Sequence, residues 1–112
     1  MTLPLVLFAA AALGGLLMAI VRFSGKPLPP FSIAIIHGVA AALGLVLLIL
    51  AVSKAGGGGP TAALGLLVLA ALGGFVLFSQ HLRKAALSIP LIVAHASLAV
   101  AGFVTLLVSA LG

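Results

Sequence analysis

The chain has 112 residues, of which 65% are hydrophobic and 4% are charged, with no Asp, no Glu and no Cys. Soluble domains carry about 25% charged residues, so this composition excludes a soluble globular domain and indicates an integral membrane protein. The absence of carboxylates excludes acid–base catalysis by paired Asp or Glu and carboxylate sites for hard cations. The net charge of +5 is too thinly spread for binding to nucleic acid.

Four apolar segments follow one another along the chain. A transmembrane helix takes about 20 apolar residues, and the sequence predicts helices at about 3–22, 30–52, 60–81 and 88–111. The first is too long for the apolar core of a signal peptide and lacks a basic leader, so we expect it to be retained. Gly56–Gly59 end the second helix, and Ser88 is the predicted N-cap of the fourth. We therefore predict an all-α, four-helix transmembrane bundle that forms a single domain.

The cationic residues predict how the bundle crosses the membrane. Arg22, Lys26, Arg83 and Lys84 fall in the first and third connections, whereas Lys54 falls in the second. The positive-inside rule places the first and third connections in the cytoplasm and both termini outside it. We expect a multi-pass protein of the bacterial inner membrane, with the lipid bilayer as its first partner.

The two halves of the chain, 1–54 and 60–112, resemble each other. The sequence Ala-Leu-Gly-Gly at 12–15 recurs at 71–74, an offset of 59 residues. His37 matches His95, and Gly44 matches Gly102, at an offset of 58. One residue deleted from a connection reconciles the two offsets. The sequence therefore predicts a bundle built from two similar helical hairpins.

Two histidines fall inside the predicted spans, where ionisable residues are costly and are candidates for function. His37 and His95 each follow the cytoplasmic start of their helix by about seven residues, which at about 1.5 Å per residue places both roughly 10 Å deep. Small residues at the same depth, or on the same helix faces as the two histidines, would leave a slot beside the imidazoles. These residues are Gly14, Gly15, Ala41, Gly44, Gly73, Gly74, Ala99 and Gly102.

A flat macrocycle would fill such a slot. The iron of haem b takes two axial imidazoles from opposite sides, which requires two histidines at one depth on facing helices. His37 and His95 are therefore the predicted metal ligands. The haem propionates would need cations, and the basic residues at the cytoplasmic end are Arg22, Lys26, His81, Arg83 and Lys84.

In its two histidines and its glycine pairs, the chain resembles the four-helix, bis-histidine b-type cytochromes that serve as membrane subunits of respiratory redox enzymes. The resemblance implies an electron carrier or redox subunit rather than a complete enzyme, with quinone or a larger redox complex as its partner. That family commonly carries two haems on two histidine pairs, one near each membrane face. Only one pair exists here, which implies a single haem near the cytoplasmic leaflet.

Other interpretations of the same residues stay open. The histidines could hydrogen-bond across helices and the glycines could serve close packing, in which case the chain would be a non-redox accessory subunit of a larger membrane complex. Another ligand, such as a metal, chlorophyll or quinone, is also open, as is a site shared between two protomers of a homo-oligomer. A metal site with three histidines is not expected, because His81 lies about a turn and a half shallower, as a polar end at the interface. A channel or transporter is disfavoured, because the chain has no acidic coupling residue.

Overall fold

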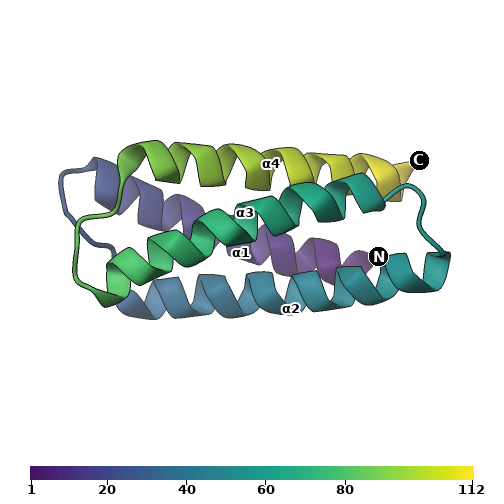
Figure 1. The fold of residues 1–112 in the computed structure, drawn as a ribbon, viewed down its shortest axis with the longest axis horizontal. Coiled ribbons are helices and arrows are strands. Elements are labelled where there is room, and N and C mark those ends of the chain that lie inside the picture. The colour runs from purple at the N-terminus through teal and green to yellow at the C-terminus, as the bar shows by residue number, and fades with distance from the viewer.

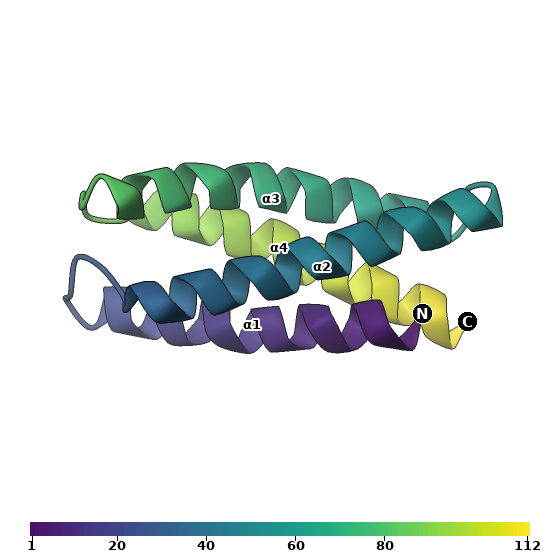
Figure 2. The same cartoon turned by 90° about the horizontal axis from the view of Figure 1, so that it is seen from below.

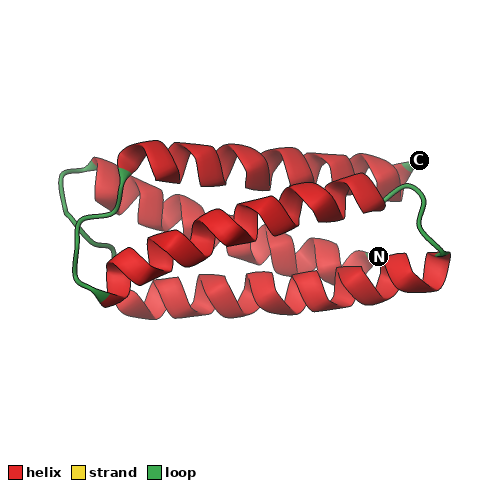
Figure 3. Ribbon diagram, in the orientation of Figure 1, coloured by secondary structure: helices red, strands yellow, loops and turns green.

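The computed structural model describes residues 1–112 as four helices joined by three short connections (Figure 1). The helices are α1 (Thr2–Phe23), α2 (Phe31–Ala55), α3 (Thr61–Leu82) and α4 (Ile89–Leu111). No strand is present, as the ribbon coloured by secondary structure also shows (Figure 3). The prediction of an all-α, four-helix bundle is confirmed.

Each helix is long and apolar enough to cross a membrane. The helices have 22 to 25 residues and a mean hydropathy between 2.3 and 2.7 over their most apolar windows. The bundle is 43 Å long and about 20 Å wide, and the hydrocarbon core of a bilayer is about 30 Å thick. Large apolar side chains such as Leu13, Phe75 and Val100 point outward and are mostly exposed. That surface suits lipid rather than water.

The helix ends lie within a few residues of their predicted positions. Helix α2 continues past the predicted residue 52 to Ala55, because a helix can run until Gly56 takes the left-handed conformation, with φ of 70°. The N–H groups of Gly56 and Gly57 then donate to carbonyls of the last turn. Ser88 is the N-cap of α4, since its hydroxyl accepts a hydrogen bond from the Leu91 N–H at 3.4 Å.

The helices form a ring in which sequence neighbours are antiparallel. Helix α1 packs most extensively on α2, and α3 on α4, while smaller α1–α4 and α2–α3 contacts close the ring. Helices α2 and α4 therefore lie diagonally opposite each other, as do α1 and α3. The first and third connections lie at one end of the bundle, and both termini lie at the other end with the second connection (Figures 1 and 2). Four of the five cationic residues are thus at one end, which we call the loop end.

The two hairpins bury corresponding residues. At the offsets of 59 and 58 residues, the buried pairs are Pro4 and Ala63, Phe8 and Leu67, Ala11 and Ala70, Pro29 and Leu87, Ala34 and Ile92, Gly44 and Gly102, and Leu48 and Leu106. His81 is the one buried residue whose counterpart, Arg22, is only half-buried. The main core cluster, which includes Phe8, Leu48 and Leu106, fills the half of the bundle near the termini. The half near the loop end is left to hold a cavity.

Candidate functional site

The side chain of His37 is held against the backbone of α1. Its Nδ1 lies 2.6 Å from the carbonyl oxygen of Ala11. A carbonyl only accepts hydrogen bonds, so Nδ1 carries the hydrogen and donates, and Nε2 keeps its lone pair. Gly14 and Gly15 make this approach possible. A Cβ at Gly15 would lie 3.1 Å from the His37 Cε1, and one at Gly14 would lie 3.3 Å from the His37 Cβ.

The second hairpin builds the same unit around His95. The His95 Nδ1 lies 2.6 Å from the carbonyl oxygen of Ala70 on α3. A Cβ at Gly74 would lie 3.0 Å from the His95 Cε1, and one at Gly73 would lie 3.6 Å from the His95 Cβ. In each hairpin, one helix supplies a carbonyl and a glycine pair, and the next helix supplies the imidazole. The glycine pairs that the sequence singled out therefore contact the histidines directly.

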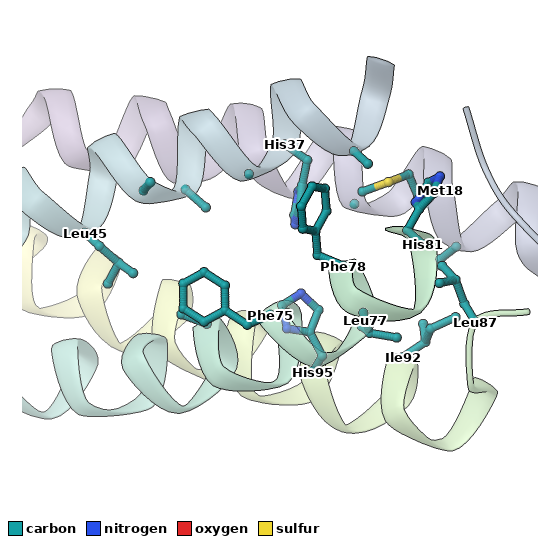
Figure 4. Close-up of a pocket in the computed structure, with 18 residues that line it drawn as sticks. Met18, His37, Leu45, Phe75, Leu77, Phe78, His81, Leu87, Ile92 and His95 are labelled. Atoms are coloured by element: carbon teal, nitrogen blue, oxygen red, sulfur yellow. The ribbon is translucent and has the colours of Figure 1, made fainter. Parts of the chain in front are cut away.

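The two imidazoles face each other across the interior of the bundle. They come from the diagonal helices α2 and α4, and their ring centres are 6.1 Å apart with the ring planes at 77°. The close-up shows His37 and His95 pointing toward one another from opposite walls of the cavity (Figure 4). No group of three or more His, Cys, Asp or Glu side chains gathers elsewhere in the structure. The pair offers two imidazoles that could hold a metal within a macrocycle, which is too few for a tetrahedral metal site.

A cavity of about 220 Å³ adjoins the imidazoles, and most of its lining belongs to α2 and α3. Of the residues singled out in the sequence, six line it: Gly15, His37, Ala41, Gly74, His81 and His95. Sequence reasoning missed other lining residues, among them Gly38 and Ala42 on α2 and Phe75 and Phe78 on α3. The two phenylalanines could have been found, because the chain has only six and these two lie within a turn of the Gly73–Gly74 pair.

The other five small residues predicted to flank the histidines do not line the cavity, and they are Gly14, Gly44, Gly73, Ala99 and Gly102. A Cβ at Gly44 would lie 3.0 Å from the ring of Phe8, and one at Gly102 would lie 2.7 Å from the Cγ of Leu67. These glycines let α1 approach α2, and α3 approach α4, within the core near the termini. Ala99 is half-buried and does not line the cavity.

The cationic residues of the loop end also lie outside the cavity. The Arg22 Nε donates to the carbonyl of Leu87 at 2.9 Å, and the Leu87 N–H donates to the carbonyl of Pro27 at 3.2 Å. These two bonds join the end of α1 and the first connection to the third connection. Arg83 and Lys84 are exposed. None of these three cationic residues belongs to the cavity lining.

The sequence predicts His81 as a polar end at the interface, but its side chain is buried in the structure. It is the one buried polar side chain of the chain, with 8% of its surface exposed. Helix α3 extends through His81 to Leu82, and the edge of the imidazole packs against the Phe31 ring of α2 at 5.3 Å between ring centres. Phe31 also stacks on Phe78 at 5.8 Å. The aromatic contact from a neighbouring helix covers His81 and keeps it from the surface.

Comparison of the chain with protein-family models, with curated proteins and with solved structures finds no match. The geometry of the histidine pair and of the surrounding cavity is therefore the basis for an assignment of function.

Proposed function

We propose that the protein is a membrane b-type cytochrome in which His37 and His95 hold one haem b. The observation that carries the proposal is the arrangement of the two imidazoles. They face each other from diagonal helices, and each donates its Nδ1–H to a backbone carbonyl. Metal-bound histidines almost always donate their second ring nitrogen in this way, which fixes the tautomer and directs the other nitrogen at the metal.

The separation of the rings supports the same proposal. Imidazole nitrogens bind metals at about 2 Å, and the ring centre lies roughly 1 Å behind the nitrogen, so two axial imidazoles have ring centres roughly 6 Å apart. The observed separation is 6.1 Å. The two hairpins therefore hold the imidazoles at a spacing that would suit one metal ion between them.

The volume of the cavity sets a condition on the proposal. About 220 Å³ is less than the roughly 300–1,000 Å³ of sites that enclose ligands of drug size. A macrocycle therefore requires the side chains of Phe75 and Phe78 to turn away from the imidazoles. Phe75 is 70% exposed and can move farther into the surrounding lipid. On α2, Gly38, Ala41 and Ala42 leave the part of the wall between His37 and Leu45 without bulky side chains.

When bound, haem b supplies one-electron redox chemistry, and the chain supplies position and exclusion of water. The carbonyls of Ala11 and Ala70 hold the imidazoles, and the apolar lining keeps the site dry. We place the loop end in the cytoplasm and both termini outside it, because most of the cationic residues are at the loop end. The partner that we propose is quinone or a redox subunit, met near the cytoplasmic leaflet of the bacterial inner membrane.

A second function is favoured by the same hydrogen bonds. The bonds of His37 and His95 tie α1 to α2 and α3 to α4 without any ligand, as interhelical bonds do in membrane bundles. With that role alone, the chain would be a non-redox accessory subunit of a larger membrane complex.

A reduced-minus-oxidised absorption spectrum of the detergent-purified protein separates the two functions. We expect a sharp α-band from the wild type, lost or altered in both His37→Ala and His95→Ala. Lys54→Ala is the control, because it changes an exposed residue at the opposite end of the bundle and should keep the band. A colourless wild type that takes up no added haem b, while all four proteins keep their helical circular dichroism, would rule out the cytochrome and favour the accessory subunit.

A further inference from the structure

The loop end carries positive charge that nothing in the chain neutralises. Arg22, Lys26, Arg83 and Lys84 gather there, and the chain has no Asp or Glu with which any of them could pair. Arg22 donates to a backbone carbonyl, whereas the other three are exposed and make no side-chain hydrogen bond within the chain. The anions that balance these charges must therefore come from outside the protein.

A cleft at this end places one of the cations beside apolar side chains. It lies between the start of α2 and the end of α3, and we call it the Lys84 cleft. It is lined by Leu28, Pro29, Phe31, His81, Leu82 and Lys84. Leu82 is 59% exposed and Phe31 is 47% exposed, so the cleft has apolar sides that face outward. His81 lines both this cleft and the interior cavity.

The backbone of Lys84 is unusual for a residue with a side chain. Its φ is 57°, and it is the one residue other than glycine with a positive φ. The position follows the end of α3, where glycine is the common residue because it avoids a steric penalty. The corresponding residue of the first hairpin, at the offset of 59, is Gly25, with φ of 110°. The second hairpin thus has an ammonium group at a place where the first has no side chain.

We propose that the Lys84 cleft binds the phosphate of an anionic phospholipid, with the Lys84 ammonium as its counter-ion and with the acyl chains lying on Phe31 and Leu82. The cleft lies at the ends of two spanning helices, which is where lipid headgroups lie. Basic residues at this level attract the anionic lipids of the cytoplasmic leaflet. The apolar sides favour a lipid over free phosphate, because free phosphate would leave Phe31 and Leu82 without a contact. The proposal uses neither His37 nor His95 and does not depend on the haem.

Competition between two lipids in native mass spectrometry tests the proposal. The full chain in a neutral detergent is mixed with equal amounts of phosphatidylglycerol and phosphatidylcholine, and the bound lipids are counted by mass. We expect the wild type to retain phosphatidylglycerol preferentially. Lys84→Gly should reduce its retention roughly fivefold, the effect of one lysine at a membrane surface. Glycine suits the left-handed turn, so this variant should keep the fold, and Lys84→Gln provides a second neutral variant with a long side chain.

Matched variants and a soluble competitor decide the result. Lys26→Ala removes an exposed lysine from the other connection at the same end, and Lys54→Ala removes one from the opposite end; both should leave the preference unchanged. A wild type without preference for phosphatidylglycerol would overturn the proposal. An equal loss of phosphatidylglycerol in Lys26→Ala would also overturn it, because any positive charge at the loop end would then have the same effect as Lys84. Displacement of the lipid by millimolar inorganic phosphate would identify a free phosphate site instead. His37→Ala should retain as much phosphatidylglycerol as the wild type. The lipid proposal and the haem proposal are therefore tested independently.

Discussion

The two hairpins share one structural unit and differ around it. In both, a carbonyl and a glycine pair hold a histidine of the following helix, and seven pairs of corresponding residues are buried. The differences fall mainly on the side where α2 meets α3. In the alignment of the two hairpins, His81 corresponds to Arg22 and Lys84 corresponds to Gly25. Gly38 of α2 corresponds to Ala96 of α4. The shared positions maintain the fold and the imidazole pair. Of the divergent residues, His81 and Gly38 line the cavity, and His81 and Lys84 line the Lys84 cleft.

The correspondence between the two hairpins determines which variants form matched pairs. A substitution at a shared position has a matched partner in the other hairpin and should produce the same kind of effect there. A substitution at a divergent position has no such partner. Measurements on pairs of variants therefore test whether the two hairpins behave as equivalent units.

The largest effect is expected where a glycine lets two helices touch. A Cβ at Gly102 would lie 2.7 Å from the Leu67 Cγ, and one at Gly44 would lie 3.0 Å from the edge of the Phe8 ring. Gly44→Val and Gly102→Val should each lower the free energy of unfolding by about 2–3 kcal/mol, as overpacked cores do. Gly102→Val should cost more, because the branched Leu67 Cγ lies nearer its own backbone than the edge of the Phe8 ring does.

Unfolding in mixed detergent, followed by circular dichroism, measures these changes. Gly65→Val is the control, because a Cβ at Gly65 would meet no atom within 4 Å. If Gly102→Val unfolds at the same denaturant fraction as Gly65→Val, then the close approach of α3 and α4 is not a determinant of stability.

The next effect concerns the glycines beneath the imidazoles. In Gly15→Ala and Gly74→Ala, the new methyl group would lie 3.1 or 3.0 Å from the Cε1 of His37 or His95. The ring must turn, which weakens its hydrogen bond to the carbonyl. The higher helix propensity of alanine offsets most of the loss in stability, about 1 kcal/mol each way. If His37 and His95 hold haem b as proposed, the affinity for haem b should nevertheless fall by about tenfold or more, as it does when the surroundings of a metal-bound histidine are changed.

Titration with haem b, followed at the α-band, measures this affinity, and Gly65→Ala serves as the control. The two variants should behave alike, because the two hairpins hold their histidines in the same way. A large loss in one variant and none in the other would show that the two units are not equivalent.

Much of the fold follows from local features of the sequence. Runs of apolar residues predict the spans, and Gly56 and Ser88 mark helix ends because their backbone or side-chain chemistry does so in any context. The common depth of His37 and His95 follows from counting residues, since each residue of a helix advances about 1.5 Å. These properties depend on one segment at a time.

The environment of the site depends on several segments at once. In lipid, each helix is apolar all round, so periodicity does not reveal which face points inward. For this reason the diagonal placement of α2 and α4 and the position of the cavity beside Gly38 and Phe75 could not be predicted. The burial of His81 likewise depends on Phe31, which lies 50 residues earlier in the chain.

A smaller effect is expected from the hydrogen bond that joins the end of α1 to the third connection. Arg22→Gln removes the Nε donor that binds the Leu87 carbonyl at 2.9 Å. Arg22→Lys removes the same donor but keeps the charge. Both should lower the free energy of unfolding by about 1 kcal/mol, the net contribution of one hydrogen bond. Arg83→Gln, which changes an exposed residue of the third connection, should have no effect. Full stability in Arg22→Lys would assign the role of Arg22 to its charge.

The smallest effect has the opposite sign. In lipid-free neutral detergent, Lys84→Gly should raise the free energy of unfolding by about 0.5 kcal/mol. The left-handed conformation costs a residue with a side chain about 1–2 kcal/mol, and glycine removes this cost. Glycine also loses more conformational entropy on folding, which cancels roughly 0.5–1 kcal/mol of the gain in stability. Lys26→Gly is the control, since Lys26 has no positive φ, and it should be neutral or destabilising. A less stable Lys84→Gly would mean that the lysine side chain stabilises the turn within the protein. A more stable one would mean that Lys84 lowers the stability of the fold, as expected if its ammonium serves a ligand from outside the chain.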